Sequence, residues 1–447
     1  MEKKYGLFTA IALVIGIVIG SGVFFKAPII LNASGSLGVG ILAWVIGGAI
    51  MICCAVTFAI MGTKYERVNG IVDYSEATLG SKYGYCMGWF TATLYYPSLT
   101  GVLGYVSAVY FCMITGWSDH PMAVWITGLF FLTGSFVMNA VSPKLAGRFQ
   151  VSTCVVKLIP LIAMAVGGVG YGIANGHLAN NFSMTMPAAV SGNPLFHGVV
   201  ATAFAYEGWI IATSINSELK NAKRNLPLAL VLGGLVTVVI YLVYFIGIAG
   251  GVELTALTNK AGVERAYANI FGSAIGTVLT FFITISCLGT LNGLTMGCAR
   301  GIYALAARGE GPAPTRFGKV SERFHMPIAS CGFGYVMALI VMLYFMPIDY
   351  FGLYGAGGGF LFDISELPIV TLYALYIPIF LTIIRRQRDL GPIKRFVWPT
   401  LAICGCIFMV VAAVDKFLRG GLFQYLLIFL VVMGIGLLFI TPSRKKA

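Results

Sequence analysis

Long hydrophobic runs, separated by short polar segments, follow one another along the whole chain. About 20 apolar residues are enough for a helix to cross a bilayer, and most of these runs reach that length. The pattern predicts an all-α polytopic membrane protein with twelve transmembrane helices. We expect them near residues 5–31, 37–61, 85–114, 121–140, 149–173, 195–217, 227–250, 269–306, 327–346, 352–384, 396–414 and 421–441.

The first hydrophobic run is interrupted at its centre by Gly20-Ser21-Gly22. A glycine inside a helix costs about 1 kcal/mol relative to alanine. Within a membrane, a broken helix persists only where it is buried in protein or lines a cavity. We therefore predict that helix 1 is broken here and that its backbone polar groups face a ligand near mid-membrane. The alternative is a small-residue face, Gly16-x-x-x-Gly20, which would let another helix approach closely.

A second run is interrupted in a similar way, by Glu207 and Gly208 within Phe204-Ala205-Tyr206-Glu207-Gly208-Trp209. The two interruptions open two successive groups of five predicted helices. Because five is odd, the second group enters the membrane from the opposite side. This predicts an inverted repeat with a site between broken helices 1 and 6. Within a single transport domain, 1–447, the first repeat would cover 5–175 and the second 194–385, and helices 11 and 12 would follow in 392–441.

Composition and charge agree with this class. The chain is 58% hydrophobic and 10% charged, whereas soluble domains are about 25% charged. Of its 29 basic residues, 22 lie in loops on the side of the N-terminus. The positive-inside rule places that side, and both termini, in the cytoplasm. The net charge of +13 then reflects topology and does not indicate nucleic-acid binding. We expect a multi-pass protein of the cell membrane whose partner is lipid. The other side holds Lys26, Lys260, Arg265, Lys416 and Arg419.

Lys157 is the other notable charge, in predicted helix 5. It lies about eight residues past Phe149, roughly 12 Å into a helix. An intramembrane lysine is costly and usually faces the interior of the helix bundle, although a lysine can also extend its ammonium to the interface. The four histidines, by contrast, are scattered and form no metal set. Neither a metal, a cofactor nor an enzyme active site is therefore expected. The histidines are His120, His177, His197 and His325.

Several motifs together resemble the amino acid–polyamine–organocation transporters, and within them the L-type amino acid transporter branch. Gly20-Ser21-Gly22-Val23-Phe24 resembles the break of their first helix, and residues 204–209 resemble the "FAY-x-GW" of their sixth. Residues 218–227 look like that branch's "EE-x-x-NP-x-RN-x-P" run. Residues 286–293, followed by Arg300, look like its eighth-helix signature, and Lys157 matches its fifth-helix lysine.

The sequence departs from that branch at a few positions. Ser217 replaces the first glutamate of the "EE" pair, Ala222 replaces a proline, and Glu207 fills a position that is often glycine. The loop Thr115–Pro121 is short and lacks the cysteine by which animal members link to a heavy chain. The resemblance therefore implies a single-chain exchanger of the bacterial serine/threonine or alanine-serine-cysteine kind, with no disulfide-linked heavy chain.

What the resemblance implies for structure is a leucine-transporter-like fold with alternating access. The substrate carboxylate would meet N–H groups at Ser21 and Gly22, and its ammonium would meet carbonyls near the breaks. Lys157 would stand in for the sodium ion of sodium-coupled relatives, with Ser286 and, less strongly, Tyr241 as its partners. The full set expected to bind substrate is Val18, Ile19, Gly20, Ser21, Gly22, Phe204, Ala205, Tyr206 and Glu207.

The leading hypothesis is therefore sodium-independent exchange of small neutral L-amino acids. A proton-coupled symporter, or a carrier of cationic amino acids or polyamines, is the alternative, and Glu207 is the feature that favours the cationic one. A polytopic membrane enzyme would need a cluster of His, Asp or Glu at one membrane face, and the sequence offers none. A channel fits less well, because two helix breaks in an inverted repeat suit an occluded site.

Overall fold

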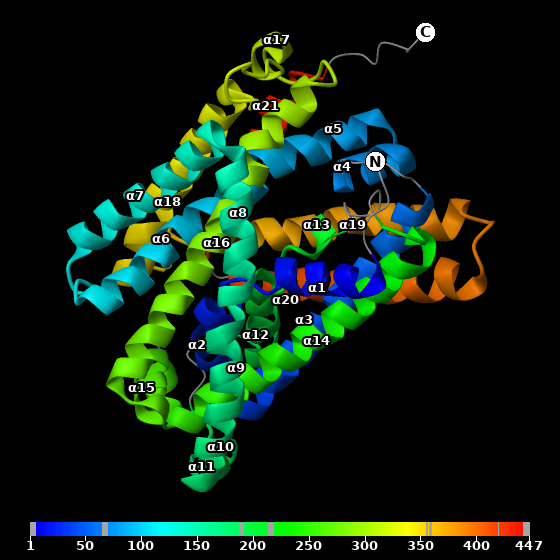
Figure 1. The fold of residues 1–447 in the computed structure, drawn as a ribbon. Coiled ribbons are helices and arrows are strands. Elements are labelled where there is room, and N and C mark those ends of the chain that lie inside the picture. Colours follow the sequence, from blue (N-terminus) through cyan, green and yellow to red (C-terminus); the bar gives the residue numbers. More distant parts are fainter. Residues whose placement is uncertain are drawn as a thin grey trace. The chain divides into compact units, whose positions relative to one another are not determined.

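The protein is described here by a computed structural model that covers residues 6–64, 70–186, 192–212, 219–258, 260–354, 356, 360–418 and 420–440. The described residues form helices joined by short loops (Figure 1). The chain divides into two compact units. Each unit contains helices from both predicted repeats, and the repeats themselves stay a prediction. Unit 1 comprises Met1–Gly70, Cys154–Ser286 and Ile369–Lys416, and unit 2 comprises Ile71–Thr153, Cys287–Pro368 and Phe417–Ala447.

The first membrane helix, in unit 1, is broken where the sequence predicted. Helix α1 (Leu7–Val18) and helix α2 (Gly22–Ser34) are bent by 56° relative to each other. The three residues between them are not helical. Gly35 then ends α2 in the left-handed region, with φ of 67°, a conformation that glycine adopts without steric cost.

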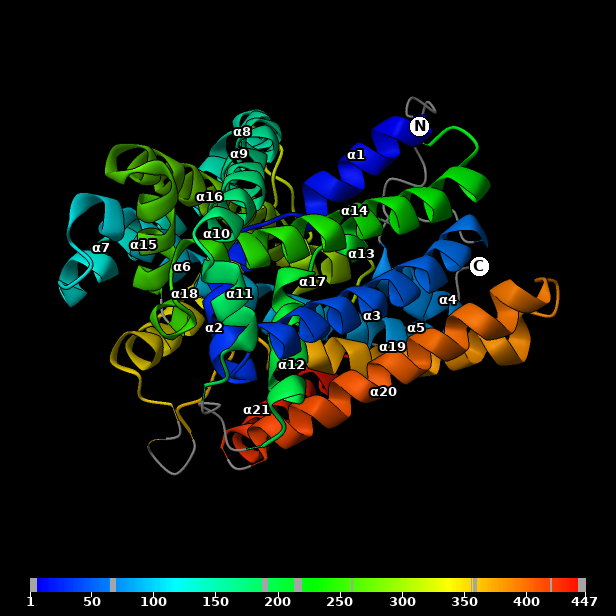
Figure 2. The ribbon, with the colours of Figure 1, turned by 90° about the horizontal axis from the view of Figure 1, so that it is seen from below.

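The long helices of unit 1 pack around this broken helix. Helix α14 (Ala222–Gly251) runs beside α3 (Leu37–Lys64) and also packs along α1, as Figure 2 shows from below. Helix α12 (Pro194–Ala205) packs against both α2 and α3. The first break therefore lies beside three packed helices of the same unit, α3, α12 and α14.

Close backbone packing joins predicted helix 5 to α14. In unit 1 helix 5 continues as α9 (Leu158–Ala163), the π-helical turn η2 (Met164–Gly168) and α10 (Val169–Ala174). A Cβ on Gly168 would lie 2.3 Å from the Gly247 carbonyl oxygen, and one on Gly250 would lie 2.1 Å from the Gly168 oxygen. Real Cβ atoms do not approach so closely. Glycines therefore let the two backbones touch, as small residues do in membrane helix pairs.

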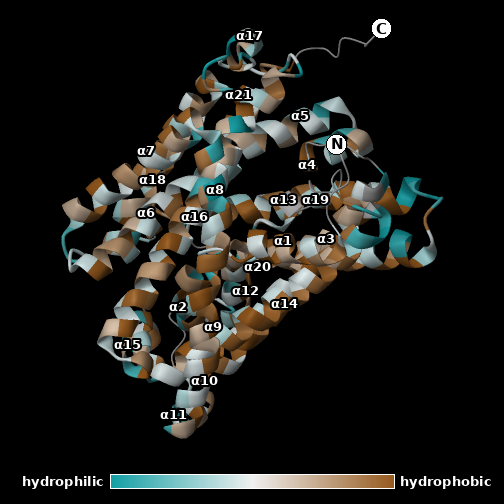
Figure 3. Cartoon of the chain, in the orientation of Figure 1, coloured by the Kyte–Doolittle hydropathy of each residue, from teal (hydrophilic) through white to brown (hydrophobic). Residues whose placement is uncertain are grey.

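Unit 1 also holds several shorter or more peripheral elements. Hydrophobic colour covers α9 and α14, and hydrophilic colour gathers at the turn between α19 and α20 (Figure 3). These elements are α11 (His177–Ser183), α13 (Trp209–Ala212), η4 (Leu254–Thr258), α15 (Lys260–Phe271), the first part of α16 (Ser273–Ala306), α19 (Leu367–Arg386), η6 (Ile393–Val397) and α20 (Trp398–Phe417).

An ion pair ties the end of α3 to the loop after α19. Lys64 Nζ lies 2.7 Å from Asp389 Oδ1 and also donates to the Gln387 side chain. The hydrogen bond from the Lys64 ammonium holds the pKa of the Asp389 carboxyl below its ordinary value. Both charges are partly exposed, with 35% and 63% of their side-chain surface accessible, so water screens much of their attraction.

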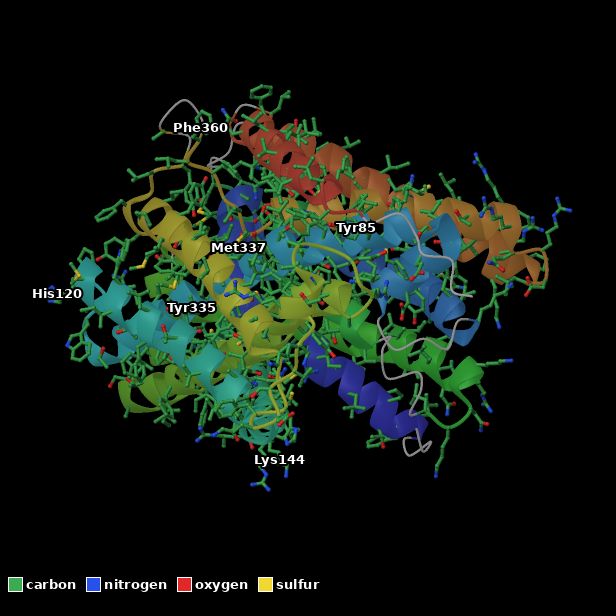
Figure 4. The ribbon with its side chains drawn as sticks, turned by 90° about the horizontal axis from the view of Figure 1, so that it is seen from above. Tyr85, His120, Lys144, Tyr335, Met337 and Phe360 are labelled. Carbon is green, nitrogen blue, oxygen red and sulfur yellow. The ribbon has the colours of Figure 1, made fainter. Side chains whose placement is uncertain are left out.

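Unit 2 is built around α6 (Tyr96–Thr115), which packs against α7 (Pro121–Val141) and α18 (Ile328–Phe351). Figure 4 labels His120, which directly precedes α7, and Lys144, which lies in the first turn of the helix that follows it. It also shows Tyr335 on α18, whose hydroxyl is 3.0 Å from that of Thr133 on α7. The remaining elements are α4 (Ile71–Leu79), α5 (Ser81–Phe90), the π-helical η1 (Thr91–Tyr95), α8 (Pro143–Val156) up to residue 153, the rest of α16, α17 (Pro314–Phe317) and α21 (Leu422–Leu437).

A buried chain of amides fastens α16 to α7 and α8 within unit 2. Asn139 Nδ2 donates to Asn292 Oδ1 at 2.8 Å, and Asn292 Nδ2 donates to Gln150 Oε1 at 3.1 Å. The Ser135 hydroxyl also donates to Thr295 at 2.9 Å. Paired in this way, the polar groups avoid the cost of being buried without a hydrogen bond.

Every one of the twelve predicted spans contains an apolar helix. Among the described residues, nine helices are long enough to cross a membrane alone, the bent pair α1 and α2 makes a tenth span, and α12 and α21 are shorter apolar helices. The predicted start of helix 10 near 352 is wrong, because the helix begins at Leu367 with Pro368 in its first turn, a position that proline favours. Part of the preceding loop, 355 and 357–359, lies outside the described residues.

Candidate functional site

The break in the first helix presents two opposite helix ends to each other. Helix α1 ends at Val18 and α2 begins at Gly22. The C-terminal carbonyls of a helix carry partial negative charge and its N-terminal N–H groups carry partial positive charge. The carbonyls at the end of α1 can therefore bind a cation, and the N–H groups at the start of α2 can bind an anion. A zwitterion such as an amino acid matches both ends.

A second break faces the first within the same unit. Helix α12 ends at Ala205, the turn 206–208 follows, and α13 begins at Trp209. Gly208 has φ of 103°, which a residue with a Cβ rarely adopts, and this explains why a glycine stands there. The Glu207 carboxylate accepts a hydrogen bond from the Gly208 N–H at 3.1 Å. Residues 213–218, and with them the departing Ser217 and the motif residue Glu218, lie outside the described residues.

The two breaks meet at Gly22. A Cβ on Gly22 would lie 2.6 Å from Ala205 Cα and 3.1 Å from the Phe204 carbonyl oxygen. No side chain fits at that distance from a backbone. Only glycine allows the start of α2 to rest on the end of α12, so Gly22 sets how close the two breaks come.

The Tyr241 hydroxyl, carried by α14, joins the two breaks. It accepts a hydrogen bond from the Gly20 N–H at 3.3 Å. It also lies 3.1 Å from the Val18 carbonyl oxygen and 3.2 Å from that of Ala205. A hydroxyl has a single proton, so it serves these two carbonyls alternately or shares its proton between them. The sequence suggested Tyr241 only as a weak partner for Lys157, and the structure places its hydroxyl on the breaks.

Aromatic rings close one side of this arrangement. The rings of Trp44, Tyr206 and Tyr241 are in mutual contact, with centroid separations between 5.3 and 5.5 Å. The Tyr206 hydroxyl donates to the Trp44 carbonyl at 3.0 Å. All three side chains are fully buried. The cluster therefore holds Tyr241 in place from α3 and from the second break, so its hydroxyl has little freedom to turn away.

Lys157 lies against the end of α1. Its ammonium donates to the Gly16 carbonyl, which also accepts a weaker hydrogen bond from the Cys154 thiol at 3.4 Å. Gly16 belongs to the last turn of α1, whose carbonyls lack helical partners and attract a cation. The helix is interrupted at Lys157 itself, because Pro160 lacks an N–H and its ring crowds the carbonyl four residues earlier. Lys157 is buried and does not reach out to the interface.

Lys26 is a second buried cation, which the sequence analysis placed outside the membrane. It lies in α2 with no accessible surface. Its ammonium is 5.0 Å from the centroid of the Phe25 ring and 5.2 Å from that of Phe204, within the range of cation–π attraction. The signal that could have revealed it is its spacing. Lys26 follows Gly22 by four residues and so shares its helix face.

Most of the predicted site residues therefore come together in unit 1. Val18, Gly20, Gly22, Phe204 and Ala205 meet through the contacts above. Ile19 and Ser21 lie within the first break and are buried, as is Tyr206 in the second. Ser286 is buried on α16, and its predicted partnership with Lys157 stays a prediction.

Comparison with known proteins fits this geometry. The sequence matches the amino acid permease family over residues 5–440. It is 30% identical over 421 residues to the serine/threonine exchanger SteT of Bacillus subtilis (strain 168), covering 92% of this chain and 90% of that protein. It is 25% identical to the human Asc-type amino acid transporter 1, covering 76% of this chain and 66% of the relative.

The fold is shared with a solved structure. The structure of MhsT in complex with L-phenylalanine aligns with a TM-score of 0.59 at 15% sequence identity, covering 93% of this chain and all of MhsT. This confirms the leucine-transporter-like fold that the family resemblance implied. By its sequence, the chain belongs to the amino acid permease family of membrane transporters.

Proposed function

We propose that this amino acid transporter exchanges small neutral L-amino acids across the cell membrane without sodium. The observation that carries the proposal is the Tyr241 hydroxyl bridging Gly20, Val18 and Ala205. This contact holds a carbonyl-rich end of α1, the N–H-rich start of α2 and the end of α12 around one point. Such a site recognises the ammonium and carboxylate common to all α-amino acids.

The substrate class is inferred from relatives and from the geometry together. SteT is named as a serine/threonine exchanger and another relative as an Asc-type amino acid transporter. The close contact of Gly22 with Ala205, and the bulky Trp44, Tyr206 and Tyr241, favour a small substrate side chain on this side of the site. The nine predicted substrate-binding residues, 18–22 and 204–207, are proposed as the backbone-binding site.

Sodium independence is proposed from the position of Lys157. Its ammonium already supplies a positive charge to the Gly16 carbonyl at the end of α1. A bound sodium ion would serve the same oxygen-rich helix end, so the lysine makes the ion unnecessary. Lys157, with Ser286 and Tyr241 as its proposed partners, would then couple the position of α1 to the transport cycle.

Location and assembly complete the proposal. The distribution of basic residues supports a cell-membrane protein with cytoplasmic termini. The short loop between α6 and α7 contains no cysteine. We therefore propose that the transporter works without a disulfide-linked heavy chain, unlike the animal members of the L-type branch.

Uptake by proteoliposomes tests this proposal. Labelled L-serine should enter vesicles only when they contain an unlabelled small neutral amino acid, and an imposed sodium gradient should not change the rate. Lysine and putrescine should not compete. Uptake into empty vesicles driven by a proton gradient would instead establish the proton-coupled alternative. Competition by cationic substrates alone would establish the cationic one, in which Glu207 supplies the attraction.

A further inference from the structure

The N-terminal half of α8, in unit 2, carries a hollow lined by Lys144, Gly147, Arg148, Val151 and Ser152, with a volume of about 600 Å³. The spacing of Lys144, Arg148 and Val151 places them on one helix face. Lys144, Arg148, Val151 and Ser152 are exposed. The side chain of Lys144 projects away from the neighbouring helices (Figure 4). A cationic hollow therefore opens outward at the point where a membrane helix begins.

The two cations of this hollow are available to a ligand. Lys144 and Arg148 are four residues apart, which makes them neighbours on the helix surface. Neither forms an ion pair with any acid in the described part of the chain. Gly147 lies between them, and a Cβ placed there would meet no atom within 4 Å. The absence of a side chain at 147 leaves the space beside the two charges open.

Apolar surface continues from the charges toward the membrane. Val151, one turn further along the helix than Arg148, has 70% of its surface exposed. A ligand that fits has an anionic group for Lys144 and Arg148, hydrogen-bond acceptors for the Ser152 hydroxyl, and a hydrocarbon portion for Val151. A free inorganic anion would use only the first of these features.

We propose that this hollow binds the headgroup of an anionic glycerophospholipid from the cytoplasmic leaflet. The phosphate would lie between the Lys144 ammonium and the Arg148 guanidinium, and an acyl chain would pass over Val151. The cytoplasmic location rests on the proposed orientation, and that leaflet is the one in which anionic lipids attract basic side chains beside membrane helices. The site is separate from the two helix breaks and does not depend on the substrate.

The test measures lipid binding to the purified full-length protein. Native mass spectrometry with dioleoylphosphatidylglycerol and, separately, with dioleoylphosphatidylcholine should show preferential retention of the anionic lipid. The double variant Lys144→Gln/Arg148→Gln should bind phosphatidylglycerol about 30-fold more weakly, as expected for losing two cations beside an anionic headgroup. Phosphatidylcholine binding should change little.

Two further variants separate a built site from general charge. Arg316→Gln/Lys319→Gln removes the same number and types of charge from exposed positions of unit 2 and should leave phosphatidylglycerol binding unchanged. Gly147→Leu keeps both charges, places a side chain in the hollow beside them and is compatible with the helix, and it should weaken binding. Circular dichroism should show all variants to be folded.

Three results would overturn the proposal. One is wild-type phosphatidylglycerol binding by the Lys144→Gln/Arg148→Gln variant. Another is an equal loss in the Arg316→Gln/Lys319→Gln control, which would assign the binding to net charge. A third is displacement of the lipid by millimolar inorganic phosphate, which would assign the hollow to a soluble anion. None of these measures serine exchange, so failure here leaves the proposed function intact, and failure of exchange leaves this site intact.

Discussion

Gly22 offers the sharpest test of the two-break site, because the structure gives the size of the collision. In Gly22→Ala the new Cβ would lie 2.6 Å from Ala205 Cα, whereas carbon atoms rest about 3.5–4.0 Å apart. Helix α2 must therefore shift by about 1 Å, or strain of about 1–3 kcal/mol must be absorbed. Either change disturbs the facing backbone groups of both breaks. We expect substrate affinity to fall by about 5- to 150-fold, and Gly22→Val to abolish exchange.

Gly16→Ala is the matched control on the same broken helix. Its Cβ would lie 3.6 Å from the Cys154 sulfur, an ordinary contact. Alanine is also favoured over glycine inside a helix by about 1 kcal/mol. Serine binding by scintillation proximity, exchange in proteoliposomes and the Tm of the purified protein should therefore be near wild type. Wild-type affinity in Gly22→Ala, or an equal loss in Gly16→Ala, would refute the reasoning.

Four further substitutions test other parts of the structure. Tyr241→Phe leaves the Gly20 N–H without its partner and should weaken serine binding by about 1–3 kcal/mol. The same binding assay measures this, and a change in affinity of less than threefold would contradict the prediction. Lys157→Ala should lower the exchange rate far more than serine affinity, since it releases α1 and shifts the populations of inward- and outward-open states. Full activity of Lys157→Arg together with unchanged exchange by Lys157→Ala would contradict this prediction. Glu207→Gln should lose less affinity than Glu207→Gly, because the amide oxygen still accepts from Gly208. Asp389→Asn should lower Tm slightly at neutral pH only. The pKa of the Asp389 carboxyl is lower in the folded protein than in the unfolded chain. Its ion pair therefore stabilises the fold above the unfolded pKa of about 4, and this stabilisation is lost as the pH falls below that value. A Tm difference between Asp389→Asn and the wild type that persists at pH 2.5 would exclude the ion pair as its cause.

Both helix breaks could be predicted because each carries a local signal. Glycine and polar residues within an apolar run are costly in a membrane helix, and this cost marks Gly20–Gly22 and Glu207–Gly208 directly. The depth of Lys157 followed from counting residues along its helix. In the structure its ammonium donates to a carbonyl of the last turn of α1.

Two features of the site had no such signal. Tyr241 is one aromatic residue in an unbroken apolar helix, and tyrosine is common in membrane proteins. Only the packing of α14 against α1 shows that its hydroxyl reaches both breaks. Lys26 was placed outside the membrane because charged residues near a span end usually are. The structure buries it, with its ammonium over the rings of Phe25 and Phe204.

The misplaced start of helix 10 has a different cause. The segment from Phe351 to Phe362 contains four aromatic residues as well as Leu353 and Leu361, so hydrophobicity alone continues the run. The chain instead turns at Gly352, which has φ of 64°. The Tyr344 hydroxyl donates to the Phe360 carbonyl at 2.6 Å and accepts from the Phe362 N–H at 3.1 Å. A side chain satisfies this backbone, which is how a nonhelical apolar segment becomes tolerable.

The Tyr241 hydroxyl also bears on how tightly a substrate can bind at the proposed site. Its single proton cannot fully satisfy the Val18 and Ala205 carbonyls together, so one of them retains acceptor capacity. We infer that a substrate ammonium takes that capacity while the hydroxyl donates to the other carbonyl. Substrate binding then adds only a few hydrogen bonds, and these go to backbone groups that already have partners. Each new hydrogen bond contributes only about 0.5–1.5 kcal/mol to binding. Modest affinity suits an exchanger, because the same site must release one amino acid before it can return with another.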